Sequence, residues 1–277
     1  MISLRKPVVA GMFYPGTPDG LSRELTRLCG VPRSLTPLDS SMGLITPHAG
    51  YVYSGAVAGE GYKELAARGT PEWAIILGSN HTGMGQPISI ATEGVWETPL
   101  GSSPIATEIA LRLVDAGVRV APEAFLREHS IEVQLPFLQH LFGLGVPFVP
   151  ICVMLPSIDD VVSLGEAIAA VAEESAGVVI ASSDFTHYQP DDVARRIDHE
   201  AIDRILALDV KGFYHKLIAE SLTICGGGAI TALMSCARTL GWEARLASYA
   251  TSGDMTGDRS AVVGYAAISF IGGRNDK

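Results

Sequence analysis

The sequence predicts an α/β fold with a mainly parallel central sheet and helices on both of its faces. Short apolar runs alternate along the chain with segments of helical periodicity, which is the order that parallel β–α units produce. Hydrophobic residues make up 47% of the chain and charged residues 18%, a balance that supports a large buried core. The chain shows no low-complexity segment and no linker, so residues 1–277 are expected to form a single domain.

The first half of the chain supplies the clearest strand patterns. Residues 146–154 (VPFVPICVM) are apolar on both faces, as strands buried inside a parallel sheet are. In the helical pattern of residues 131–142, Pro136 either kinks the helix or marks its first turn. The predicted elements of this half are strands at 43–46, 73–78, 88–91 and 146–154, and helices near 55–67, 104–116 and 131–142.

The second half ends in two long strand patterns. They flank the sequence TSGDMTGD, whose Gly and Asp residues suit a turn, so the two strands are expected to pair as a hairpin at one side of the sheet. The predicted elements of this half are helices at 157–173, 191–207, 210–219 and 227–240, and strands at 177–182, 244–251 and 260–270.

Composition argues against several partners and locations. The formal net charge is −10, and Arg195-Arg196 is the nearest approach to a basic cluster, so nucleic acids and anionic membrane surfaces are poor partners. The longest apolar stretch, residues 141–156, is too short and too broken by Gly and Pro to span a bilayer. The N-terminus lacks a signal-peptide pattern. The four cysteines are scattered, which fits a reducing cytoplasm better than a disulfide scaffold.

Polar side chains follow three of the predicted strands. His48 follows residues 43–46, His81 follows 73–78, and Asp184 and His187 follow 177–182. A lone histidine beside a strand is usually structural. Ligands, however, bind beyond the carboxyl ends of the strands in open α/β sheets, and three of the seven histidines stand at such ends. The pattern therefore predicts a shared site.

Cys225 precedes three glycines and then a predicted helix. A thiol at a helix N-terminus gains from the helix dipole and from free N–H groups, which lower its pKa. A buried cysteine in a glycine turn is the structural alternative, and no Lys-Ser/Thr follows to complete a phosphate-binding loop. Imidazoles and a thiolate together form a sensible set of metal ligands.

Residues 127–137 (REHSIEVQLPF) carry a further histidine. On a helix, His129 and Glu132 would share a face, and His129 is a candidate for a role beside the site or in proton transfer. A solvated surface would explain Glu128 and Glu132 equally well.

The remaining candidates have ordinary explanations. Tyr51, Tyr53 and Tyr188 would form an aromatic pocket wall or belong to the core. Asp254 and Asp258 suit a turn but could also reach the site. A structural or surface role is expected for the three histidines that lie in predicted helices, which are His140, His199 and His215.

Eight ordered blocks together resemble the Memo family, whose microbial members are called AmmeMemoRadiSam system protein B. The blocks are RKPVVAGMFYPG, ITPHAGYVYSG, ILGSNH, WETPLG, EHSIEVQLPFLQ, SSDFTHY, TICGGG, and TSGDMTGD with VVGYAA. They run from about Arg5 to Phe270. The resemblance implies a fold similar to that of the class III extradiol (LigB-type) non-haem iron dioxygenases. Carried over by position, it implies metal ligands His48, His81 and Cys225, with Asp184 and His187 lining the same pocket and His129 close by.

One position departs from the dioxygenase pattern. Those enzymes use two histidines and a carboxylate, whereas the third position here is Cys225, and a softer thiolate shifts metal preference toward copper or zinc. Ring cleavage therefore does not carry over. The resemblance implies iron or copper as the cofactor, with zinc as a third candidate. It also implies association with a radical-SAM protein and an AMMECR-type protein.

Three functions remain open from the sequence. The first is a metal-dependent redox enzyme in which His187 acts as a general base and Asp184 orients it or binds substrate. The second is a non-catalytic module that binds a small molecule, a peptide or a partner protein on an inherited enzyme fold. The third is metal-free chemistry at Cys225 with His187 or His129 as the base.

Overall fold

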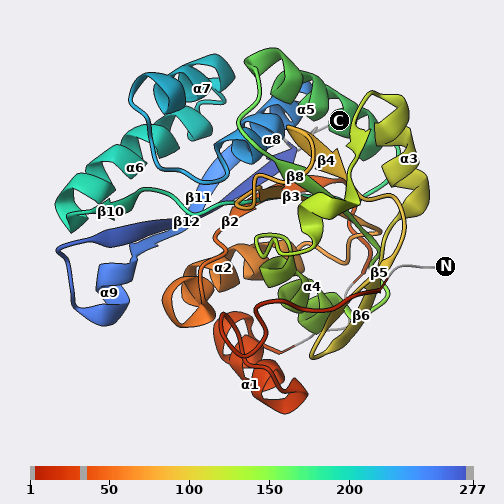
Figure 1. The fold of residues 1–277 in the computed structure, drawn as a ribbon, viewed down its shortest axis with the longest axis horizontal. Helices are drawn as coiled ribbons and strands as arrows, with labels where there is room; N and C mark the ends of the chain where they lie inside the picture. The colour runs from red at the N-terminus through yellow and green to blue at the C-terminus, as the bar shows by residue number, and fades with distance from the viewer. Residues whose placement is uncertain (1–3, 32–35, 273–277) are drawn as a thin grey trace.

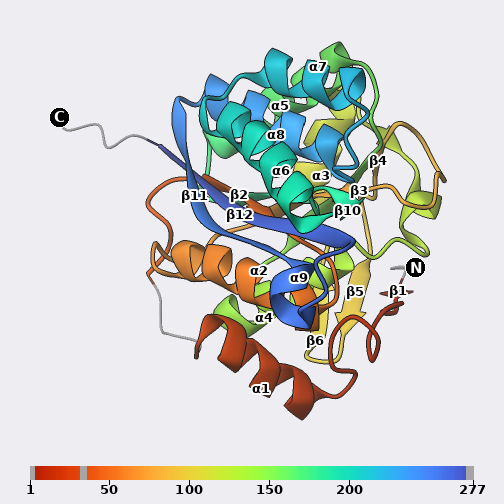
Figure 2. The ribbon, with the colours of Figure 1, turned by 90° about the vertical axis from the view of Figure 1, so that its left-hand side faces the viewer.

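The fold is known from a computed structural model, which describes residues 4–31 and 36–272. A large twisted sheet forms the middle layer, and helices cover both of its faces (Figures 1 and 2), so the predicted α/β class is confirmed. In spatial order the strands are β10 (His187–Gln189), β12 (Val262–Gly272), β2 (Met42–Thr46), β9 (Val178–Ser182), β3 (Ala74–Ser79), β8 (Phe148–Val153), β4 (Ile88–Ile90) and β7 (Arg119–Val120), and β11 (Trp242–Thr251) pairs with β12.

The four middle strands of the sheet are parallel, and antiparallel pairing joins them to the strands on either side. Strands β2, β9, β3 and β8 run in the same direction, and every residue in them is buried. Strands covered on both faces read as continuous apolar runs, which is why the sequence marked these four clearly. Antiparallel pairing joins β12 to β2 and β4 to β8, and the hairpin predicted for the last two strands forms between β11 and β12. The parallel centre brings the carboxyl ends of three strands together at one edge.

Helices α5, α6, α7 and α8 lie on one face of the sheet and α1, α2 and α4 on the other (Figures 1 and 2). None of the helices in residues 4–31 and 36–272 combines the length and the apolar character that crossing a bilayer requires. The bounds are α1 (Pro18–Cys29), α2 (Tyr51–Ala66), α3 (Thr107–Asp115), α4 (Leu135–Phe142), α5 (Ile158–Ala172), α6 (Asp191–Leu206), α7 (Val210–Ala219), α8 (Gly227–Thr239) and α9 (Ser252–Thr256), with 3₁₀ turns η1 (Pro122–Phe125) and η2 (Glu132–Gln134).

Several elements differ from the sequence prediction. Helix α1 was not predicted, although Thr17 caps it, Pro18 opens it and Leu21, Leu25 and Leu28 form its buried stripe. Pro136 stands in the first turn of α4, one of the two predicted alternatives. The elements that the prediction missed altogether also include β7, β10, a short helix inside TSGDMTGD (α9), and the small sheet of β1 (Leu4–Arg5), β5 (Val95–Thr98) and β6 (Gly101–Pro104).

Glu132 is fully buried, so surface solvation does not explain it. Its carboxylate accepts hydrogen bonds from the Val8 and Val9 backbone N–H groups and from the Tyr14 hydroxyl, and it forms an ion pair with Arg5 at 2.8 Å. The expectation that it shares a helix face with His129 is also wrong, because His129 precedes η2 in a loop. Glu132 instead fastens the N-terminal segment to the body of the protein.

Replacing this carboxylate is expected to destabilise the fold strongly. Glu132→Ala leaves the buried Arg5 without its counter-charge and three other donors without an acceptor, which is expected to cost about 3–5 kcal/mol of unfolding free energy in urea denaturation. Glu60→Ala is the matched control: it removes an exposed pair with Lys63 and is expected to cost about 0–1 kcal/mol. Equal losses in the two variants would contradict the structural role of Glu132.

Candidate metal centre

The carboxyl ends of β2, β9 and β3 open into a cavity of about 650 Å³. His48 follows β2, His81 follows β3, and Asp184 and His187 follow β9, and all four side chains line this cavity. The parallel pairing places them together because neighbouring parallel strands end at the same edge of the sheet.

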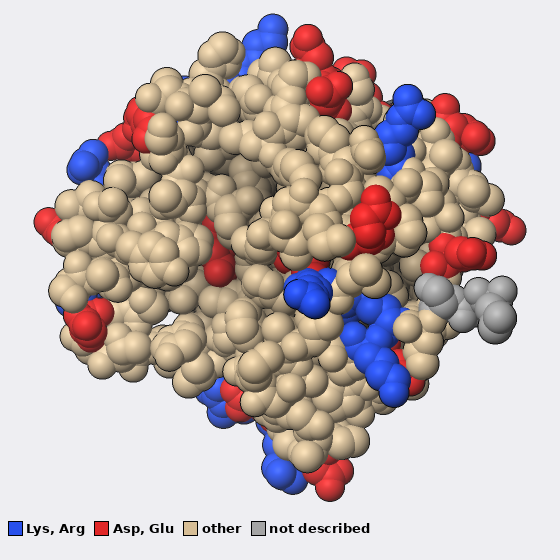
Figure 3. Space-filling view, viewed as in Figure 1, with Lys and Arg blue, Asp and Glu red and all other residues tan. Residues whose placement is uncertain are grey.

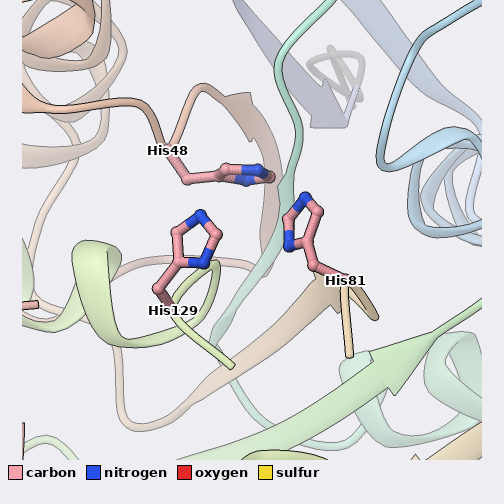
Figure 4. Close-up of side chains that lie close together, drawn as sticks. All are labelled: His48, His81 and His129. Carbon is pink, nitrogen blue, oxygen red and sulfur yellow. The ribbon is translucent and has the colours of Figure 1, made fainter. Parts of the chain in front are cut away.

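Three imidazoles converge on the floor of the cavity (Figure 4). Each of His48, His81 and His129 offers a ring nitrogen, and these nitrogens all lie within 4.8 Å of one another. The rings of His81 and His129 stack with centroids 4.7 Å apart, while His48 stands edge-on to both. His129 comes from the loop before η2, so three separate segments build the cluster.

Cys225 lies against the same cluster. Its Sγ is 3.3 Å from Nε2 of His48 and accepts a hydrogen bond of 3.2 Å from the Asp184 backbone N–H. The glycines that follow make this approach possible. A Cβ on Gly226 would lie 2.5 Å from Cβ of Ser183, and one on Gly228 would lie 2.2 Å from the Met154 carbonyl oxygen. The glycine run therefore packs the start of α8 against the strand ends.

Ser182 fixes the orientation of His48. The Ser182 hydroxyl donates to the Ser130 carbonyl at 2.7 Å, so its oxygen is left to accept from Gln134 Nε2 at 2.7 Å and from His48 Nδ1 at 3.1 Å. His48 Nδ1 therefore carries the hydrogen, and Nε2 faces Cys225. Sequence reasoning missed Ser182 and Gln134, and no local motif distinguishes either one.

Glu128 orients His81 in the same way. Its fully buried carboxylate accepts from the His81 backbone N–H at 2.6 Å and lies 2.9 Å from Nδ1. It also accepts from the backbone N–H groups of His129 and Ser130. Surface solvation is thus wrong for Glu128 as well. A carboxylate on one ring nitrogen orients a histidine and raises the basicity of the other nitrogen, which is the usual support of a metal-binding histidine.

The ionisable groups are strongly coupled. Burial raises the pKa of the Cys225 thiol, but the opposing effect of His48 and His81 is larger, and the net result is a pKa lowered to about 5. Burial lowers the pKa of His81, yet Cys225 and Glu128 raise it to about 10. For His129, burial and the nearby His48 outweigh the opposing attraction of Glu128, 3.6 Å away, and lower the pKa to about 4. At neutral pH the protein without metal therefore holds a thiolate and a neutral His129.

Asp184 and His187 stand at the side of this cluster. Asp184 is buried and its Oδ1 accepts from the backbone N–H groups of His48 and Ala49 at 2.8 and 3.3 Å. Nδ1 of His187 lies 2.7 Å from the Phe185 carbonyl and 2.9 Å from the Thr223 carbonyl. Two carbonyls can only accept, so Nδ1 must donate, and Nε2 makes no hydrogen bond within the described residues.

The structure separates the remaining candidates. Tyr51 is a core residue whose hydroxyl donates to the Val133 carbonyl, whereas Tyr53 and Tyr188 line the cavity. Asp258 also lines it, but Asp254 caps α9 and pairs with arginines. The described lining of the cavity lacks the three histidines for which a structural or surface role is expected, His140, His199 and His215.

Comparisons with known proteins identify the family. The family described as Memo-like protein matches residues 5–269. The chain belongs to the Memo family. A MEMO1 family protein of Methanopyrus kandleri is 45% identical and one of Desulfurococcus amylolyticus 44% identical, each alignment covering 96% of this chain and 98% of the relative.

A solved structure shares the fold of this Memo family member. An uncharacterized protein of Escherichia coli K12 matches with a TM-score of 0.57 over 83% of this chain and 99% of that protein. The sequences are 11% identical, so the likeness concerns the fold alone.

The Cys225 thiol is expected to titrate far below an ordinary cysteine. In chelator-treated protein, the ultraviolet absorbance of the thiolate should disappear on acidification around pH 5, whereas an unperturbed thiol titrates near 9.0. The transition belongs to the coupled Cys225–His48 pair. Cys225→Ser should abolish it, because burial raises the pKa values of Cys29, Cys152 and Cys236. A transition near 9.0 would refute the thiolate.

Proposed function

We propose that this Memo family protein binds one metal ion through His48, His81 and Cys225 and acts as a metal-dependent redox enzyme related to the non-haem iron dioxygenases. The observation that carries the proposal is the convergence of three imidazoles in an open cavity, with the thiolate-prone sulfur of Cys225 3.3 Å from Nε2 of His48. Cys225 itself is absent from the described lining of that cavity. Nitrogen and sulfur ligands suit iron, copper or zinc, and the softness of the thiolate favours copper or zinc over magnesium or calcium.

The residues fit a metal ion of this kind. Hydrogen bonds to Ser182 and Glu128 turn one nitrogen of His48 and one of His81 away from the cavity, which leaves Nε2 of each ring as the ligand. When bound, iron or copper would supply one-electron redox chemistry, and zinc would supply Lewis acidity. His129, neutral and adjacent, is available as a further ligand or as a proton carrier.

Asp184 and His187 would act on the substrate. His187 lines the cavity with Nδ1 held by backbone carbonyls, so Nε2 is the nitrogen that would accept a proton from a bound substrate. Asp184 makes no hydrogen bond to His187 within the described residues, so substrate binding suits it better than orienting that histidine.

We also propose a location and partners for the protein. All four cysteines are free thiols, which supports a reducing cytoplasm. Family resemblance supports radical-SAM and AMMECR-type proteins as partners.

Elemental analysis of anaerobically purified variants tests the ligand set. Wild-type protein is expected to carry one iron, copper or zinc per chain, and His48→Ala, His81→Ala and Cys225→Ala to carry almost none. His215→Ala, on the exposed face of α7, is the control and should retain the metal.

His129→Ala decides between two ligand sets. Loss of metal in His129→Ala together with full retention in Cys225→Ala would replace the thiolate with a third histidine. Metal-free wild-type protein that binds a small molecule or peptide without turnover would favour a non-catalytic binding module instead.

Metal binding is expected to weaken as the pH falls. Burial opposes the charged form, but neighbouring groups raise the pKa of His48 to about 9 and that of His81 to about 10, so both rings hold protons at neutral pH that the metal must displace. Apparent affinity should therefore rise with pH up to about 9–10. Calorimetry in buffers of different ionisation enthalpy measures the protons released. The Glu128→Gln variant should release fewer protons when it binds the metal. A metal affinity that does not change with pH would contradict this account.

A further inference from the structure

Strand β11 ends the sheet on one side with an edge that has no partner strand. Within the described residues, its ten residues pair with β12 alone. Helices α2 and α6 pack against its two faces, and Figure 2 shows β11 at the border of the sheet. A strand edge of this kind offers a row of backbone N–H and C=O groups to another strand.

The register with β12 tells which backbone groups of β11 face outward. The Val263 N–H of β12 donates to Ser252, which directly follows β11, so the odd-numbered residues of β12 turn their N–H and C=O groups toward β11. These odd-numbered residues stand opposite Glu243 and Arg245, which therefore bond to β12. The residues that alternate with these two turn their backbone groups outward, and they are Trp242, Ala244 and Leu246.

Glu243 and Arg245 carry the charges of this edge. Both are exposed, and neither forms an ion pair within the described residues. Both lie on the α2 side of the sheet, because Arg245 and Ile271, the residue opposite Glu243, line a hollow of about 340 Å³ there. Arg68 and Glu64 line the same hollow. Two arginines and one carboxylate leave the hollow with a net positive charge, which a carboxylate from a partner would neutralise.

We propose that a second copy of this chain pairs with this edge, so that two β11 strands run antiparallel about a two-fold axis through Ala244. The same surface then serves both copies, as closed dimers require. The backbone groups of Ala244 bond those of the partner's Ala244, and the backbone groups of Trp242 bond those of the partner's Leu246. The two sheets become one continuous sheet across the axis.

Charge selects this register from the alternatives. An axis through Ala244 sets Glu243 opposite the partner's Arg245, and the symmetry repeats that contact. The two side chains stand at a non-hydrogen-bonded position, where cross-strand neighbours come closest. An axis through Glu243 or Arg245 would set like charges opposite each other. The bulge between Leu246 and Ser248 ends the regular edge, so the pairing is confined to the start of β11.

The pairing leaves the candidate metal centre open. Ile271, which stands opposite Glu243, pairs on its other side with Met42 at the amino end of β2, whereas the cavity lies at the carboxyl end. In the space-filling view the hollow of the cavity is bordered mainly by uncharged residues (Figure 3). The dimer therefore depends on neither the proposed metal nor the proposed reaction.

Light scattering coupled to size-exclusion chromatography of the full chain tests the dimer. The wild-type protein is expected to approach twice the chain mass of 29.2 kDa as its concentration rises. Glu243→Arg alone and Arg245→Glu alone each set like charges opposite each other, which should weaken dimerisation roughly 10-fold or more. The double variant exchanges the two charges, so it restores both ion pairs and should recover the dimer. Wild-type protein that stays monomeric up to millimolar concentration would overturn the proposal.

A control and a second readout place the contact. Glu108→Arg, exposed on α3, reverses a charge away from β11 and should leave the dimer unchanged, and circular dichroism checks that each variant is folded. Hydrogen exchange followed by NMR should show the N–H groups of Ala244 and Leu246 exchanging more slowly in the wild-type dimer than in Glu243→Arg at the same concentration. A dimer that survives both single reversals, or that leaves these N–H groups unprotected, would refute this interface.

Discussion

Two fully buried carboxylates in the segment between η1 and α4 hold the site together. Glu128 accepts from His81 and from the backbone around His129, so one side chain positions two of the three converging imidazoles. Glu132 binds Arg5, Tyr14 and the backbone at Val8 and Val9. That second anchor brings Phe13 against the His129 ring, with centroids 4.9 Å apart. Charges buried this deeply are tolerated because their hydrogen bonds are nearly complete, and removing either would strand its partners.

The strand ends and the glycine run bring together the side chains that Glu128 and Glu132 help to hold in place. Parallel pairing of β2, β9 and β3 delivers His48, Asp184 and His81 to one edge of the sheet. Gly226 and Gly228 allow α8 to begin so close to that edge that the Cys225 sulfur meets Nε2 of His48. The sulfur, lying between two imidazoles, stays ionised, and this distinguishes the centre from one built on two histidines and a carboxylate.

The cavity divides into a floor and a mouth with different properties. The floor carries the imidazoles of His48, His81 and His129, and hydrogen bonds to the buried Ser182 and Glu128 orient the first two. The mouth carries exposed aromatic and apolar side chains, and one of them, Tyr188, sits on a strained backbone. Rigid positioning of this kind is what the proposed metal site would require, because ligands must be held at fixed geometry.

The sequence by itself determined the α/β class, the four central strands and the residues at the strand ends, because continuous apolar runs and the polar residues that follow them are local patterns. Local signals for α1 were present as well, in its cap, its first proline and its stripe of leucines. Only the tertiary structure decided the surroundings of these residues. Glu128 and Glu132 look like surface residues until the N-terminal segment folds over them, and Ser182 and Gln134 acquire a role only when His48 lies beside them. The physical reason is that burial and hydrogen bonding depend on contacts between residues far apart in the chain, which no local pattern records.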